Sequence, residues 1–408
     1  MGRRRGRKPR SGCRGWVGDS GGPKAKLFHP ALEGPQRTQR PFDQHCEQRY
    51  SEPVRAADEL KLIHGPAIKN RIFLAPLTNC QSHEDGTISD DEYRFLVMRA
   101  EGGFGMTMTC ASHVQAVGQG FPGQLGVFSD KHLPGLTHLA KGIKAFGSNA
   151  SVQLHHAGRI SPKELVGTPV APSDDAESGA RGMSEAEVEQ LIEDFIAAAV
   201  RCEKAGFDGI EIHGAHGYIL CQFLSPEYNR RTDRFGGSLE NRYRPIDMIC
   251  EGIRQRCSPD FQVGLRISVE RYGVELMEAV EVARWVLADP RFDYLDLSLW
   301  DVDKEPKEEQ YKGLLRSYFT SLPRSGVRLG AAGKIGSGAA IQSVLDDGFD
   351  FVSIGRGAIL HHDFAKRVLA DPTFEQRDLP VTEAYLASEG LGPPFIKYMR
   401  GRPGFVEG

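Results

Sequence analysis

Short apolar runs alternate with longer amphipathic segments along most of the chain. The run at 209–213 is typical: Ile210 and Ile212 follow Gly209 and Gly214 ends the run, which predicts a short buried strand. We expect eight such strands, at residues 71–77, 106–111, 151–155, 209–213, 262–267, 294–299, 327–331 and 351–354.

Segments with helical spacing of apolar residues lie between and after these strands. One begins with Ser184 and carries Glu187 three residues later, a capping box that opens a helix expected to reach Ala205. The other helices are expected at residues 90–101, 133–146, 244–256, 276–288, 314–322, 337–347 and 361–370. Eight strand–helix units predict an α/β fold of the TIM (β/α)8 barrel type.

Other segments depart from this alternation. Residues 60–70 alternate apolar and polar side chains, which predicts a small hairpin that plugs the bottom of the barrel. Residues 156–183 are too long for an ordinary connection and predict a functional loop over the site. We assign residues 1–50 to a disordered extension, 51–390 to the barrel and 391–408 to a C-terminal tail.

Charge is distributed unevenly along the chain. Residues 1–50 hold 12 Lys and Arg against 4 Asp and Glu, whereas the remainder holds 39 against 50. The basic run RRRGRKPR is typical of a nucleic-acid patch or a nuclear address, but a solvated tail is the favoured interpretation. The head has neither a secretory signal nor an amphipathic presequence, and no apolar run is long enough for a membrane span. We therefore expect a cytoplasmic protein without a membrane partner.

Metal sites are not indicated by the cysteines or histidines. The eight cysteines form no CxxC pair, so neither a zinc ribbon nor a clustered iron–sulfur ligand set is encoded. His213 and His216 have the spacing of a zinc pair, but no third ligand follows at a fixed distance. We expect no metal.

Candidate chemistry is concentrated after the strand at 209–213. His213 ends that strand, His216 follows three residues later and Tyr218 two residues after that. One turn can direct two imidazoles and a phenol into a single pocket at the carboxyl ends of the strands, where parallel barrels keep their active sites. A single strand-end histidine is more often structural, but this group of three favours a functional site.

Glycine-rich turns after the last two strands predict a phosphate site. Residues 330–338 (GAAGKIGSG) include Gly333, and Gly355 and Arg356 follow the eighth strand, so backbone N–H groups and a guanidinium are available. Residues 118–123 (GQGFPG) also satisfy the GxGxxG dinucleotide pattern. Pro122 lies inside that pattern and no helix follows at once, so we interpret it as a mobile loop.

The sequence HGAHGY at 213–218, with the residues after it, resembles the signature of the Old Yellow Enzyme family of FMN-dependent ene-reductases. The other residues that carry the resemblance are Asn229, Arg231, Thr232, Asp233, Gly236, Gly237, Ser238, Glu240, Asn241 and Arg242. The similarity extends from about Leu60 to about Asp371 and implies a barrel that holds FMN and uses NADH or NADPH. Phe235 departs from the usual tyrosine, and Pro245 should kink its helix or delay the start.

The resemblance implies roles for single residues. It maps the flavin ring to Pro76, Leu77, Thr78, Ala111, Gln153 and Arg266, while the turns with Gly333, Gly355 and Arg356 remain the candidates for the phosphate. His213 and His216 match the donor pair that binds the electron-withdrawing oxygen of an activated alkene, and Tyr218 matches the residue that protonates the α carbon. Two imidazole N–H groups can stabilise an enolate, and a phenol suits proton delivery.

We therefore expect a reductase of α,β-unsaturated carbonyl compounds that depends on FMN and NAD(P)H. Other flavin chemistry on the same barrel, dienoyl-CoA reduction or oxidative demethylation, stays open, and nucleic-acid binding through the basic head is an alternative of another class. The role of Cys80 is open, because some relatives place a substrate-side tyrosine there. In a homo-oligomer, the tail FIKYMRGR at 395–402 could reach a neighbouring subunit's pocket.

Overall fold

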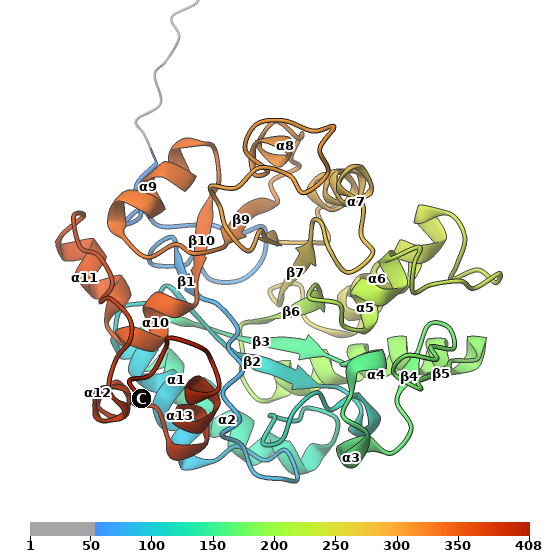
Figure 1. Cartoon of the computed structure of the whole chain (residues 1–408), viewed down its shortest axis with the longest axis horizontal. Helices are drawn as coiled ribbons and strands as arrows, with labels where there is room; N and C mark the ends of the chain where they lie inside the picture. The colour runs from blue at the N-terminus through green and yellow to red at the C-terminus, as the bar shows by residue number, and fades with distance from the viewer. Residues whose placement is uncertain (1–53) are drawn as a thin grey trace, which may run out of the picture. The chain divides into compact units, whose positions relative to one another are not determined.

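The computed structural model describes residues 54–408, and the extension predicted at 1–50 lies outside the described residues. Within the described part, eight parallel strands close into a barrel in the order β1-β10-β9-β8-β7-β6-β3-β2. Figure 1 shows the helices arranged around this barrel. The prediction of a TIM barrel is confirmed. The barrel strands are β1 Ile72–Leu74, β2 Met106–His113, β3 Asn149–His155, β6 Gly209–Gly214, β7 Gln262–Ser268, β8 Tyr294–Ser298, β9 Arg328–Ala332 and β10 Phe351–Ile354.

Amphipathic helices cover the outside of the barrel and pack their buried faces against it. The helices that follow the successive strands are α1 Asp90–Glu101, α2 Leu133–Lys144, α4 Glu185–Lys204, α6 Leu239–Arg256, α7 Leu276–Ala288, α8 Ser317–Thr320, α9 Gly338–Asp346 and α11 Phe364–Ala370. The further helices are α3 Lys163–Val166, α5 Ile219–Leu224, α10 Arg356–Leu360, α12 Glu383–Ser388 and α13 Pro393–Arg400. None of the helices within residues 54–408 is long and apolar enough to cross a membrane.

A separate apolar cluster fills the amino-terminal end of the barrel. Leu60 and Ile68 form the antiparallel bridge of the expected hairpin and are buried in this cluster. The rings of Phe73 and Phe351 stack there at 4.2 Å. Glycines make room for such rings, since a Cβ on Gly264 would lie 2.0 Å from a ring carbon of Tyr294. The barrel is therefore closed at this end, and a ligand must bind at the other.

The first strand is shorter than expected, because β1 ends at Leu74 and not at residue 77. The amide of Ala75 still donates to the carbonyl of Ile354 at 3.0 Å. Pro76 has no N–H with which to continue the ladder. Residues 76–78 therefore leave the sheet at the mouth of the barrel, where part of this turn lines the pocket described below.

Pro245 does not delay the start of its helix, so of the two expected effects the kink stays a prediction. Helix α6 begins at Leu239, earlier than predicted, because the side chain of Ser238 caps it by accepting from the amide of Asn241. Pro245 removes only the backbone hydrogen bond to the carbonyl of Asn241 and buries its ring in the core. The cap at Ser238 and the burial of one helix face stabilise the helix by more than the lost hydrogen bond costs.

The other differences between predicted and observed helices concern short helices. Helix α5 was not expected, and the single helix expected at 361–370 is preceded by a second one, α10. Both are too short for hydrophobic spacing to reveal them. The helix expected at 314–322 shrinks to α8, which lies between Gly313 (φ 83°) and Pro323.

The expectation that residues 156–183 form a loop over the site stays a prediction. This segment contains α3 and a two-stranded sheet of β4 (Val170–Ala171) and β5 (Arg181–Gly182). It packs against Arg231, which donates to the carbonyls of Pro172 and Met183. No residue of the segment lines the large pocket at the barrel mouth.

Candidate active site

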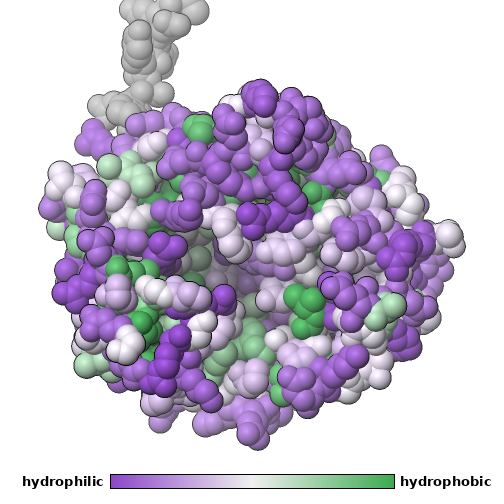
Figure 2. Space-filling model, in the orientation of Figure 1, coloured by the Kyte–Doolittle hydropathy of each residue, from purple (hydrophilic) through white to green (hydrophobic). Residues whose placement is uncertain are grey.

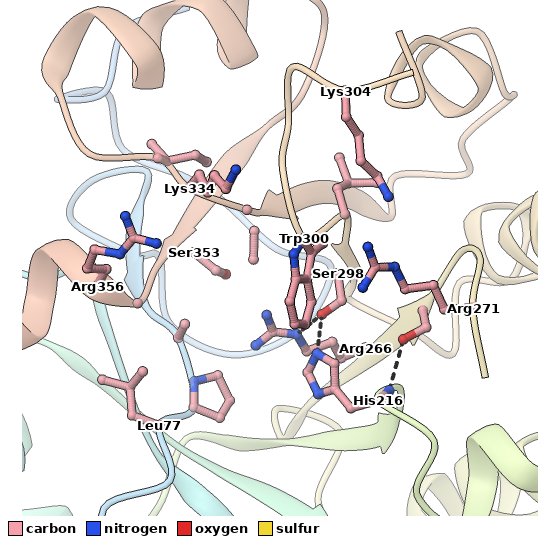
Figure 3. Close-up of a pocket in the computed structure, with 18 of the residues that line it drawn as sticks. Leu77, His216, Arg266, Arg271, Ser298, Trp300, Lys304, Lys334, Ser353 and Arg356 are labelled. Carbon is pink, nitrogen blue, oxygen red and sulfur yellow. Dashed lines mark hydrogen bonds between the residues drawn. The ribbon is translucent and has the colours of Figure 1, made fainter. Parts of the chain in front are cut away.

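A pocket of about 430 Å³ lies at the carboxyl ends of the barrel strands. Figure 2 shows a hollow near the centre of this face with hydrophilic residues along much of its rim, and Figure 3 shows side chains that line the pocket. The predicted site residues that line it are Pro76, Leu77, His216, Arg266, Gly333, Gly355 and Arg356. Turns after β1, β6, β7, β9 and β10 thus meet at one cavity.

The two glycine-rich turns meet at one side of the pocket. Gly333 has φ 158°, and a Cβ there would lie 2.8 Å from the amide nitrogen of Asp301. Lys334, in the same turn, donates to Asp301 at 2.8 Å. Arg356 is exposed at the start of α10. Backbone N–H groups and a guanidinium are therefore placed together, as the binding of a phosphate requires.

Arg266 is held in the floor of the pocket. Its Nε donates to the hydroxyl of Ser298 at 2.7 Å, and Nε lies 3.7 Å from a carboxylate oxygen of Asp296. The hydroxyl of Ser353 donates to the same carboxyl at 2.8 Å. The terminal nitrogens of Arg266 have no hydrogen-bond partner among the described residues. They remain available to a ligand.

Gln153 and Glu211 form a buried pair on the adjacent strands β3 and β6. Nε2 of Gln153 donates to Glu211 at 2.7 Å, which leaves the amide oxygen of Gln153 to accept from a ligand. Burial and the nearby carboxyl of Asp296 raise the pKa of Glu211. Ala111 lies beside Gln153 in the register of β2 and β3. Neither Ala111 nor Gln153 lines the large pocket, and Thr78 directly follows the lining residue Leu77.

The structure brings His213, His216 and Tyr218 close together, and of these three His216 lines the pocket. Nδ1 of His216 lies 3.4 Å from Nε2 of His213, and the rings of His213 and Tyr218 are 5.1 Å apart. His216 has a left-handed backbone (φ 62°) that is fixed by a hydrogen bond of 2.9 Å from its amide to Ser268. Such strain is typical of residues that a site must hold in place.

One set of tautomers satisfies all contacts of the two imidazoles. Nδ1 of His213 accepts from the amide of Ala215 at 3.3 Å, so its Nε2 carries the proton and faces Nδ1 of His216. Nε2 of His216 then donates to Ser298, 2.9 Å away, which also accepts from Arg266. The hydroxyl of Ser298 can also donate to Nε2 of His216. In that case His216 carries its proton on Nδ1 instead.

Burial sets the protonation of the three groups. It lowers the pKa of His216 to about 3, with a further contribution from Arg266, and lowers that of His213 well below its usual value. Both imidazoles are therefore neutral near pH 7. Burial also raises the pKa of Tyr218 to about 12, so the phenol keeps its proton.

Several residues at the site escaped sequence reasoning. Ser298, Glu211 and Asp296 lie on strands, where alternation shows that a side chain faces inward but not what it contacts. His155 packs its ring edge-on against Tyr218 at 4.3 Å, and both of its ring nitrogens are buried without partners among the described residues. It ends β3, and His213 lies one residue before the end of β6, so its place at a strand end is the signal that could have revealed it.

A second cavity of about 560 Å³ lies between the turn after β1 and the C-terminal tail. Cys80 lines it with Tyr398 and Arg402 of the same chain. Burial, and then Glu92, raise the pKa of Cys80 to about 11, so its thiol is protonated and poorly nucleophilic near pH 7. Whether the tail reaches a neighbouring subunit stays a prediction.

The residues that carry the resemblance serve mainly as supports. Nδ2 of Asn229 donates to the carbonyls of Phe223 and Phe235, both at 2.8 Å. Arg242 is buried and pairs with Glu278. These bonds hold the chain between α5 and α6, which follows Tyr218.

Close contacts with two histidines explain the first two glycines of the GxGxxG pattern at 118–123. A Cβ on Gly118 would lie 2.4 Å from a ring carbon of His156, and one on Gly120 would lie 3.2 Å from Nε2 of His155. The segment therefore needs glycines to approach the two histidines at the end of β3. Within residues 54–408, no group of three or more His, Cys, Asp and Glu is placed to hold a metal ion.

Comparison with known proteins identifies the family. The model of the NADH:flavin oxidoreductase / NADH oxidase family matches residues 62–372. The chain belongs to this family. It is 37% identical over 316 residues to the probable NADH-dependent flavin oxidoreductase YqiG of Bacillus subtilis, covering 74% of this chain and 85% of YqiG. It is 34% identical over 304 residues to the NADPH dehydrogenase of Bacillus pumilus, covering 72% and 88%.

A solved structure supports the fold. The Old Yellow Enzyme homologue of Zymomonas mobilis superposes with a TM-score of 0.71 over 84% of this chain and 99% of that chain, at 24% identity. This likeness shows the fold, and the family model and the two relatives confirm the flavin oxidoreductase family that the resemblance implied. The family depends on FMN and uses NADH or NADPH as reductant, as expected from the sequence.

The pocket of this flavin oxidoreductase fits FMN. Arg356 and the amides beside Gly333 and Gly355 would hold the phosphate, at one side of the pocket. The free terminal nitrogens of Arg266, which lines the pocket, suit the acceptors on the pyrimidine edge of the flavin. Gln153 has an amide oxygen free to accept but does not line the pocket, so its contact with the flavin stays a prediction.

Proposed function

We propose that this oxidoreductase reduces the activated C=C bond of α,β-unsaturated carbonyl compounds with NADH or NADPH. The observation that carries the proposal is the pair of neutral imidazoles, His213 and His216, whose facing nitrogens lie 3.4 Å apart beside Tyr218. When bound, FMN supplies the hydride chemistry between the nicotinamide and the alkene. The side chains must then bind the carbonyl oxygen and deliver one proton.

The imidazole pair suits the carbonyl oxygen. An oxygen that contacts Nε2 of His213 and Nδ1 of His216 requires N–H groups on both atoms. His213 already carries its proton on Nε2. His216 acquires one on Nδ1 if the hydroxyl of Ser298 donates to Nε2, because Ser298 still accepts from Arg266. Two donors held in place then stabilise the negative charge that develops on the enolate oxygen.

Tyr218 suits the delivery of the proton. Its pKa of about 12 keeps the phenol protonated across the physiological range, and its ring lies next to the ring of His213. A positioned acid of this kind donates to the α carbon of the enolate. The side chain is only partly buried, so a phenolate can recover its proton from solvent.

Turnover of simple substrates tests the proposal. FMN-loaded protein would be given cyclohexenone or a dienoyl-CoA, each with NADH and with NADPH, and the saturated product would be identified by mass. We expect reduction of cyclohexenone. Turnover of the dienoyl-CoA alone would favour the other flavin chemistry on this barrel, and no turnover of any enone by flavin-loaded protein would contradict the proposal.

A further inference from the structure

We propose that one side of the pocket, formed by Arg271, Trp300 and Lys304 and called here the Trp300 platform, binds the adenosine diphosphate moiety of a reactant. That moiety is present in the nicotinamide donor and in coenzyme A thioesters. This proposal concerns a second ligand site and does not depend on which compound the enzyme reduces. It therefore goes beyond enone reduction.

Trp300 lies at a position where packing would contribute little to the stability of the fold. The residue is 58% exposed, although it lines the pocket. Its backbone has φ 67°, a left-handed conformation that disfavours bulky residues. An exposed aromatic ring with a strained backbone at the mouth of a barrel indicates a binding role, because packing does not compensate for the strain.

The same strain recurs in the neighbouring loop. Arg271 and Tyr272 have φ 69° and 53°, and the amide of Val274 closes their turn on the carbonyl of Arg271 at 2.9 Å. The ring of Tyr272 lies so close to Gly217 that a Cβ there would be 2.8 Å from it. This contact fixes the turn and presents Arg271 to the pocket.

Backbone bonds also fix the position of Trp300. The amide of Leu299 donates to Ala332 at 3.0 Å, and that of Val302 donates to Gly333 at 3.2 Å. The indole therefore projects from a segment that is held on both sides. A fixed aromatic face loses little conformational entropy when a planar base stacks on it.

Charge and stacking are combined in the platform. The guanidinium of Arg271 lies 4.6 Å from the centre of the Trp300 ring. Arg271 forms no ion pair among the described residues, whereas Lys304 pairs with Glu270 and Lys334 pairs with Asp301. Arg271 can therefore bind an anion next to a base on the indole.

The pocket has more cationic sites than FMN can use. In Figure 3, Arg356 and Arg271 lie on opposite sides of the pocket, with Trp300 between them. FMN carries one phosphate, which suits the side with Gly333, Gly355 and Arg356. Arg271 remains for a second anion. Adenosine diphosphate offers both a purine for the indole and a diphosphate for the guanidinium, and a small enone offers neither.

Binding of ADP to the FMN-loaded protein tests the platform directly. We expect calorimetry to show ADP binding that Trp300→Ala weakens about tenfold, in line with the loss of base stacking, and that Trp300→Phe largely retains. Arg271→Ala should weaken it by a similar factor. The control Met277→Ala removes an exposed side chain from α7, outside the pocket, and should leave ADP binding unchanged.

Kinetics distinguish the two sources of the moiety. If the nicotinamide donor is the ligand, Trp300→Ala raises about tenfold the ratio of KM for NADH to KM for 1-benzyl-1,4-dihydronicotinamide, which lacks ADP. If a thioester is the ligand, ADP instead competes with an enoyl-CoA for the reduced protein.

The inference is overturned if ADP binds the parent and Trp300→Ala equally, if millimolar ADP does not bind, or if Trp300→Ala loses FMN while ADP binding is unchanged. ADP binding needs no enone, so failure of the proposed enone reduction would be recognised separately.

Discussion

The hydroxyl oxygen of Ser298 lies 2.9 Å from Nε2 of His216, and the same oxygen accepts a hydrogen bond of 2.7 Å from Arg266. The serine has one proton to donate, and Arg266 can only donate to it. His216 is therefore the partner that can receive that proton. Ser298 thus links the guanidinium in the pocket floor to the protonation of the imidazole pair.

Replacing Ser298 with Ala should weaken the binding of the carbonyl oxygen. Without the hydroxyl, His216 loses the described partner that can donate to Nε2 when the proton lies on Nδ1, so the tautomer that provides the second donor is destabilised. We expect kcat/KM for a neutral enone to fall about tenfold, the loss of one hydrogen bond of about 1.4 kcal/mol. Ser353→Ala is the matched control, since this serine lines the same pocket but bonds Asp296. Equal effects of the two variants would contradict the role.

Tyr218→Phe should separate the two half-reactions. The variant keeps the ring that packs against His155 and removes the proton. We expect enone reduction to fall by about 10²- to 10⁴-fold, the usual contribution of general acid catalysis, while reduction of the flavin by NADPH stays nearly unchanged. Stopped-flow traces measure both steps, with Tyr311→Phe as the control outside the pocket. If both half-reactions slowed equally, Tyr218 would be acting on pocket structure and not as an acid.

Titration of Tyr218 and His216 should not change the rate of enone reduction between about pH 5 and about pH 10. Tyr218 must be protonated to act, and its raised pKa of about 12 means that activity is lost only as pH rises toward that value. The imidazoles must be neutral, and the lowered pKa of about 3 for His216 means that activity is lost only as pH falls toward it. A pH profile of single-turnover oxidation checks both limits. A fall centred near pH 6.5 would show that an imidazole titrates normally.

Arg356→Ala should chiefly weaken the retention of FMN. A hydrogen bond between charged groups contributes about 1.5–3 kcal/mol, so the dissociation constant of FMN should rise about 10- to 100-fold. Absorbance of the flavin after dialysis measures this. Arg367→Ala is the control, because Arg367 lies on α11 and pairs with Asp363. Full retention of flavin by Arg356→Ala would place the phosphate elsewhere.

Deleting residues 1–50 should leave FMN content and enone turnover unchanged, because the described residues by themselves bring together the proposed contacts to FMN. The full chain and the deletion would also be compared for binding to RNA and DNA at moderate salt. Nucleic-acid binding that is lost on deletion would support the alternative role of the basic head. A loss of turnover on deletion would contradict the expectation.

Much of the barrel could be predicted because local sequence controls it. Buried parallel strands such as 209–213 are apolar runs between glycines, and Ser184 with Glu187 is a complete start signal. Short helices were missed for the opposite reason. Helix α5 has six residues, and all are buried, so no polar face marks it as helical.

The site was predictable only where chemistry clusters along the chain. His213, His216 and Tyr218 are neighbours in sequence, and the structure keeps them together. Ser298 and Trp300 come from another strand end, and their proximity to Arg266 and Arg271 depends on the register of β7 and β8. Contacts across strands of this kind cannot be inferred from spacing along one segment.

The C-terminal tail has a practical consequence for how the protein is prepared. Phe395 packs against Phe95 on α1, and the amide of Glu407 donates to Val381 at 2.9 Å, so the last residues are bound to the barrel domain. Arg402 lies in the same cavity as Cys80. An affinity tag fused after Gly408 would add residues directly beyond this bound segment, six residues after Arg402. Kinetic constants for large substrates should therefore be measured after such a tag has been cleaved.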